Sequence, residues 1–118
     1  MLASLLLATN LATLTPAQTA QLADCIYRAE GGAHTRYRYG ILSVRTSQPR
    51  KVCINTIEHC FVRWRNSGGF IRNPSGVAFL TELSNHYCPP STDPIGHTRW
   101  LRNVKWMLGH SERIKPAK

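Results

Sequence analysis

Signals that start and stop helices divide most of this chain into helical segments. The first segment opens with Thr15, Pro16 and Gln18, which combine an N-cap hydroxyl, a proline at the first helical position and a capping-box glutamine. Apolar residues follow at helical spacing until the paired glycines Gly31 and Gly32. We therefore expect the first helix between these two signals.

The same signals predict three more helices, at residues 47–68, 75–88 and 98–110, with a polar loop at 91–97. Tryptophans occupy helical positions in two of them and are expected in the core or half-buried beside it: Trp64, Trp100 and Trp106. Aromatic and β-branched residues around Gly40 predict a short strand or extended segment near residues 38–45. The predicted class is mainly α, with four to five helices.

The length of 118 residues fits one domain with one core, which we place at residues 15–118. The apolar run within residues 1–14 is interrupted by Thr9 and Asn10 and is too short to span a bilayer. It resembles a secretory signal but lacks the preceding basic residues. Two interpretations stay open, a cleaved signal or an N-terminal helix packed on the domain. No later segment is apolar enough to cross a membrane.

The net charge of +9 predicts attraction to a polyanion, whether nucleic acid, a membrane surface or an anionic cell-wall polymer. The four cysteines would allow two disulfides in three pairings. Their spacing matches no paired C-x2-C pattern, so we expect buried thiols or one disulfide, no metal and no cofactor. The cysteines are Cys25, Cys53, Cys60 and Cys88.

Glu30 is one of only six carboxylates, and it falls on the last turn of the first predicted helix. The helix dipole disfavours negative charge there and raises the pKa of an acid. A raised pKa suits a general acid that protonates a glycosidic oxygen. A second carboxylate across the bond is not evident, because Asp24 lies more than a turn upstream and Asp93 lies in the predicted loop.

The order of these features resembles the lysozyme-like superfamily, especially lytic transglycosylases. "YGILSV" is similar to the G-L-M-Q segment of that family, and "INTIEHCFVRWRNSGG" is similar to the helix that follows it. "LSNHYCPP" falls where the family has a helix end with a tyrosine, and the tail from Tyr87 is similar to small phage-encoded members. The chain departs from the family pattern at four positions: Gly31, Ser43, His59 and His97.

The resemblance implies a lysozyme-like fold and cleavage of peptidoglycan by Glu30 alone, acting as acid and then as base. The substrate's own 6-hydroxyl would replace water and leave a 1,6-anhydro sugar. The resemblance also implies substrate-binding residues: Tyr39, Gly40, Ile41, Ser43 and Tyr87. It implies a monomer that meets peptidoglycan strands in the periplasm, outside the cell or on a virion.

Two other classes of function stay open. A small basic helical protein could bind nucleic acid nonspecifically through its arginines and lysines. Against this alternative, the charges are spread over several segments, and no helix-turn-helix, zinc-finger or RNP-like pattern is present. A virion structural protein that keeps a lysozyme-like fold without activity is the third alternative.

Overall fold

The computed structural model describes residues 9–29 and 47–110, and within these two ranges the chain folds into helices without a strand. The helices are α2 (Pro16–Ala29), α3 (Pro49–Asn66), α4 (Gly69–Arg72), α5 (Gly76–Tyr87) and α6 (Pro94–Gly109). The prediction of a mainly α fold with four to five helices is confirmed. The strand predicted near residues 38–45 lies outside the described residues.

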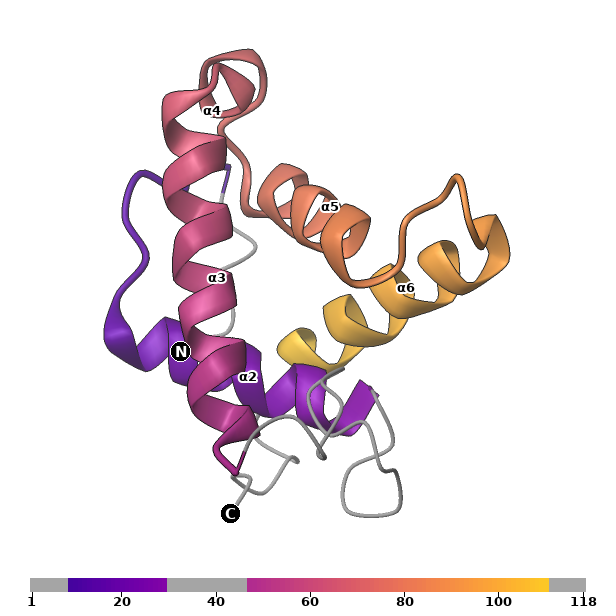
Figure 1. The fold of residues 1–118 in the computed structure, drawn as a ribbon. Helices are drawn as coiled ribbons and strands as arrows, with labels where there is room; N and C mark the ends of the chain where they lie inside the picture. Colours follow the sequence, from indigo (N-terminus) through magenta and orange to yellow (C-terminus); the bar gives the residue numbers. More distant parts are fainter. Residues whose placement is uncertain (1–8, 30–46, 111–118) are drawn as a thin grey trace.

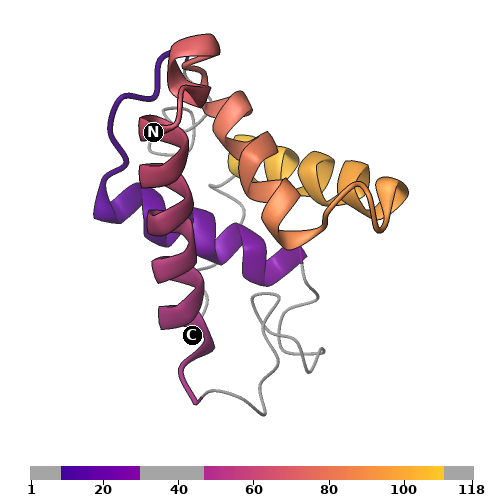
Figure 2. The ribbon, with the colours of Figure 1, turned by 45° about the horizontal axis from the view of Figure 1, so that its top comes forward.

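The helices are arranged around one shared centre. In Figure 1, α3 runs across α2, and α4 follows at the far end of α3. The chain then turns back through α5, and α6 returns past α5 towards α2, as the turned view in Figure 2 also shows. Helix α2 therefore packs against both α3 and α6, and α3 packs against α5.

The capping box predicted at the start of α2 is confirmed. The backbone N–H of Gln18 donates to Oγ1 of Thr15 at 3.1 Å, and the backbone N–H of Thr15 donates to Oε1 of Gln18 at 2.9 Å. These reciprocal bonds satisfy two backbone donors at the helix start. Helix α2 is described as far as Ala29, so its predicted end at the two glycines lies outside the described residues.

Helix α6 begins at Pro94, four residues before the predicted start, so the prediction of a loop over residues 91–97 is partly wrong. The reason is a start signal within that loop. Asp93 is the N-cap, its Oδ1 accepts from the N–H of Gly96 at 2.9 Å, and Pro94 follows at the first helical position. The carboxylate of Asp93 therefore stabilises a helix start.

The short helix α4 was not predicted. It follows Gly68, whose φ of 91° is in the left-handed region that glycine adopts without strain. A Cβ atom at Gly69 would approach Cδ1 of Trp64 to 2.5 Å. The two glycines therefore let the chain turn tightly over the Trp64 ring at the end of α3.

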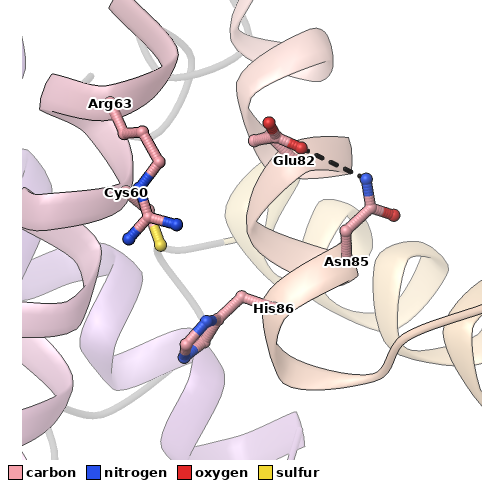
Figure 3. Close-up of a pocket in the computed structure, with 5 residues that line it drawn as sticks. All are labelled: Cys60, Arg63, Glu82, Asn85 and His86. Atoms are coloured by element: carbon pink, nitrogen blue, oxygen red, sulfur yellow. Dashed lines mark hydrogen bonds between the residues drawn. The ribbon is translucent and has the colours of Figure 1, made fainter.

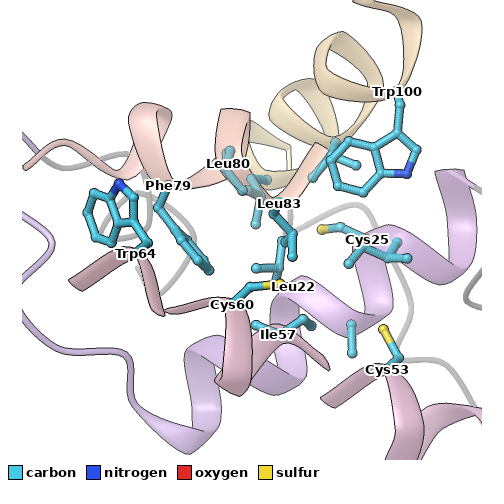
Figure 4. Packing of buried hydrophobic residues seen from close by; sticks show 14 of the residues in the cluster. Leu22, Cys25, Cys53, Ile57, Cys60, Trp64, Phe79, Leu80, Leu83 and Trp100 are labelled. Carbon is cyan, nitrogen blue, oxygen red and sulfur yellow. The ribbon is translucent and has the colours of Figure 1, made fainter. Parts of the chain in front are cut away.

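One hydrophobic cluster joins α2, α3, α5 and α6 (Figure 4). Its fully buried side chains include Leu22, Ile26, Ile57, Phe79, Leu80, Leu83, Val104 and Leu108. Trp64 and Trp100 are buried in it as expected. The prediction is wrong for Trp106, which is 55% exposed and stacks on the ring of His110 with centroids 4.1 Å apart.

Residues 9–15, which directly precede α2, pack on the domain in a non-helical conformation. Leu11 is 3% exposed, and its backbone N–H donates to the carbonyl of Pro74 at 2.7 Å. Nε of Arg65 donates to the carbonyl of Ala12 at 2.8 Å. Residues 9–15 thus contribute both a core side chain and backbone contacts. None of the described helices is long and apolar enough to cross a bilayer.

Candidate functional site

Among the candidate site residues, Tyr87 falls within the described part of the chain. The other candidates lie outside the described residues: Glu30, Tyr39, Gly40, Ile41 and Ser43. The described elements nearest in sequence to these residues are the C-terminal half of α2 and the first turns of α3, and Tyr87 lies at the end of α5 and contacts α6. Three contacts define how these elements meet.

The first contact is an ion pair between α2 and α3. Nη1 of Arg50 donates to Oδ1 of Asp24 at 2.6 Å, and both side chains are partly shielded from solvent. A short charge-assisted bond of this kind fixes orientation as well as adding stability. It holds the start of α3 against the C-terminal half of α2, and it occupies the carboxylate of Asp24.

The other two contacts are made by Tyr87, the last residue of α5. Its hydroxyl donates to Sγ of Cys53 on α3 at 3.2 Å, and its ring stacks on Trp100 of α6 with centroids 5.4 Å apart. Cys53 lies nearly one turn after Arg50 on the same helix. Tyr87 therefore joins α5 to α3 and α6, and its partner Cys53 lies on the same helix as Arg50 of the ion pair with Asp24.

None of the four cysteines, all within the described ranges, forms a disulfide, and Cys25, Cys53 and Cys60 are buried. The expectation of buried thiols is confirmed for these three, and the alternative of one disulfide is wrong. Residues 9–29 and 47–110 contain no group of three or more side chains that could hold a metal ion. Burial, followed by the nearby carboxylate of Asp24, raises the pKa of Cys25 to about 12.

The raised pKa of Cys25 predicts a loss of stability at alkaline pH. A thiol in the unfolded chain ionises near its ordinary pKa of 9.0, whereas folded Cys25 keeps its proton until about 12. Between these values the folded state binds more protons, so this thiol lowers the free energy of unfolding by up to about 1.4 kcal/mol per pH unit as pH rises. Urea unfolding between pH 8 and 10.5 measures the slope. Cys25→Ala should make the free energy of unfolding depend less on pH. An unchanged slope would mean that other groups cause the alkaline loss of stability.

A pocket of about 270 Å³ opens between α3 and α5 (Figure 3). Its lining residues are Cys60, Arg63, Glu82, Asn85 and His86. Burial raises the pKa of Cys60, the Arg63 guanidinium opposes this shift and the Glu82 carboxylate adds to it. Sequence reasoning missed the pocket because its charged residues are 19 positions apart in the chain. The available signal was polar residues at helical spacing on α3 and on α5.

Comparisons of the chain with protein-family models, with curated proteins and with solved structures find no match.

Proposed function

We propose that the protein cleaves the glycan strands of peptidoglycan as a lytic transglycosylase. It would act at the β-1,4 bond between N-acetylmuramic acid and N-acetylglucosamine, with Glu30 as the single general acid and base. The basic surface, with a net charge of +9, would attract the anionic cell-wall polymer. We place this activity in the periplasm, outside the cell or on a virion.

The observation that carries the proposal is that the carboxylates of Asp24 and Asp93 have structural roles. Asp24 is paired with Arg50 at 2.6 Å, and Asp93 caps α6 through a bond of 2.9 Å to the N–H of Gly96. These were the two candidates for a second catalytic acid near Glu30. Because both carboxylates have structural roles, a mechanism in which Glu30 acts without a second carboxylate fits the structure best.

In this mechanism Glu30 begins protonated and gives its proton to the glycosidic oxygen as the bond to C1 of the muramic acid breaks. The resulting carboxylate then accepts the proton of the sugar's C6 hydroxyl, and the C6 oxygen bonds to C1. Glu30 ends protonated, and no water is consumed. Tyr87, whose ring is half-buried and whose hydroxyl donates to Sγ of Cys53, is proposed to contact the substrate.

Mass spectrometry of digested peptidoglycan tests the proposal. We expect muropeptides that end in 1,6-anhydro-N-acetylmuramic acid, lighter by one water than hydrolytic products. Asp24→Asn and Asp93→Asn should each keep the rate within about tenfold of the wild type, because loss of a catalytic carboxylate costs far more. Asparagine also serves as an N-cap, so Asp93→Asn should retain the start of α6.

Two results would contradict the single-acid mechanism. Products with reducing ends would mean that water is the nucleophile. A collapse of the rate in Asp93→Asn, with α6 still folded by circular dichroism, would identify Asp93 as a second catalytic acid.

Nonspecific binding of nucleic acid is the second candidate, and exposed cations on α3, α4 and α6 favour it: Lys51, Arg63, Arg65, Arg72, Arg99 and Arg102. Phosphate contacts of this kind weaken steeply with salt. An electrophoretic shift of labelled DNA across a salt series, run beside a turbidity assay on purified cell walls, separates the two functions. Wall binding without lysis would instead favour an inactive virion structural protein.

A further inference from the structure

The pocket between α3 and α5 presents both signs of charge. Arg63 reaches it from α3, and Glu82 reaches it from the facing side of α5 (Figure 3). Its volume of about 270 Å³ is slightly below the range of roughly 300 to 1,000 Å³ that drug-sized ligands occupy. The pocket therefore suits a ligand smaller than a drug-sized molecule, a class that includes a single amino-acid group.

The two charged groups of the pocket are not paired with each other. Within the described ranges no ion pair joins Arg63 to Glu82, although both line the pocket. The carboxylate of Glu82 accepts a bond of 3.2 Å from the side-chain amide of Asn85, which restrains its position. Both charged side chains are exposed at the pocket wall and can meet a ligand.

The remaining lining residues contribute a thiol, an amide and an imidazole. Cys60 is 6% exposed, and burial raises its pKa, so the thiol is neutral at physiological pH. His86 supplies an imidazole from the last turn of α5. A ligand with one cation and one anion would match this wall, whereas a ligand with one charge would leave Arg63 or Glu82 unmatched.

We propose that this pocket binds the zwitterionic end of a peptidoglycan stem peptide, an amino-acid group with an ammonium and a carboxylate on one carbon. Arg63 would bind the carboxylate, and Glu82 would bind the ammonium. The source of the ligand rests on the proposed function. The pocket would add recognition of the peptide to cleavage of the glycan.

The position of the pocket fits a ligand attached to a sugar near Tyr87. Cys60 lies seven residues after Cys53, which corresponds to about 10 Å along α3 from the atom that Tyr87 contacts. Three extended residues span a similar distance of roughly 10 Å. His86 in the pocket wall directly precedes Tyr87. A stem of about three residues would thus reach from a sugar at Tyr87 into the pocket.

Two muramyl tripeptides of equal length test the charge requirement. One ends in meso-diaminopimelate, whose side chain carries an ammonium and a carboxylate on the same carbon, and the other ends in lysine, which carries the ammonium alone. The wild-type protein should bind the diaminopimelate tripeptide about tenfold more tightly, because one charge-assisted bond is added. Titrations followed by NMR chemical shifts measure both dissociation constants.

Two variants test whether Arg63 binds the carboxylate of the ligand and Glu82 its ammonium. Arg63→Gln should remove the preference for diaminopimelate, and Glu82→Gln should weaken binding of both tripeptides by about fivefold or more. Glu58→Gln and Arg99→Gln are matched controls, since both side chains are exposed and lie outside the pocket lining. These controls should keep the wild-type constants, and thermal unfolding confirms that each variant is folded.

Equal binding of the two tripeptides by the wild type would overturn the proposal, as would equal losses in the control variants. Digestion of glycan strands stripped of their peptides separates this inference from the proposed function. Cleavage of stripped glycan by a protein that binds neither tripeptide would reject the pocket alone. Charge-dependent tripeptide binding by a protein that cleaves no glycan would support the pocket and reject the transglycosylase.

Discussion

Glu30→Gln is expected to abolish lysis of purified cell walls. The amide has the shape of the acid but cannot give a proton to the leaving oxygen, and general acid catalysis contributes about 10² to 10⁴ in rate. Because Glu30 would act in both steps, we expect the loss to be at the upper end of this range or beyond it. Turbidity of a cell-wall suspension, followed over hours, measures the residual rate.

The control for this experiment is Glu58→Gln, which makes the same chemical change at an exposed position on α3. It should keep the wild-type rate. The free energy of unfolding of Glu30→Gln should change by less than about 1 kcal/mol, since the replacement is isosteric. Lysis by Glu30→Gln at the wild-type rate would remove Glu30 from the mechanism, whereas a large loss of stability would make the lost activity uninformative.

The helices were predictable because their signals are local. The capping box at Thr15 and Gln18 is a sequence pattern, and the structure contains both of its hydrogen bonds. The start of α6 was missed although Asp93 and Pro94 form an equally local signal. The polar composition of residues 91–97 favours a loop, whereas the capping oxygen of Asp93 starts a helix within this run.

Contacts between helices were not predictable in the same way. Nothing in the spacing of Asp24 and Arg50 indicates that they form an ion pair of 2.6 Å, because they lie 26 positions apart. The same is true of the Tyr87 hydroxyl and the Cys53 thiol, which lie 34 positions apart. Periodicity gives the buried face of each helix but not the partner that this face meets.

Trp106 shows a further limit of helical spacing. It lies two residues after the buried Val104 and two before the buried Leu108, which places it on the opposite side of α6. Its size and hydrophobicity suggested the core, but its angular position on the helix decides exposure. For the candidate site, the sequence indicated Tyr87 at a helix end, and the structure adds that this residue joins α5 to α3 and α6.

The largest loss of stability is expected for Phe79→Ala. Phe79 is fully buried on α5. The centroid of its ring lies 5.3 Å from the ring centroid of Phe61 and 5.4 Å from that of Trp64, and both of these residues are on α3. Removing such a ring leaves a cavity and typically costs about 3 to 5 kcal/mol. Since domains of this size are stable by only about 5 to 15 kcal/mol, urea unfolding should show a clear shift of the midpoint.

Two further variants test whether this loss comes from packing between α3 and α5. Phe79→Leu keeps most of the buried volume and should cost less than about 1.5 kcal/mol. Val77→Ala, on the same helix at a position 38% exposed, should cost less than about 1 kcal/mol. If Phe79→Ala costs no more than Val77→Ala, then α5 does not pack on α3 through Phe79. That packing also brings Glu82 opposite Arg63, so the charged pocket would lose its structural basis with it.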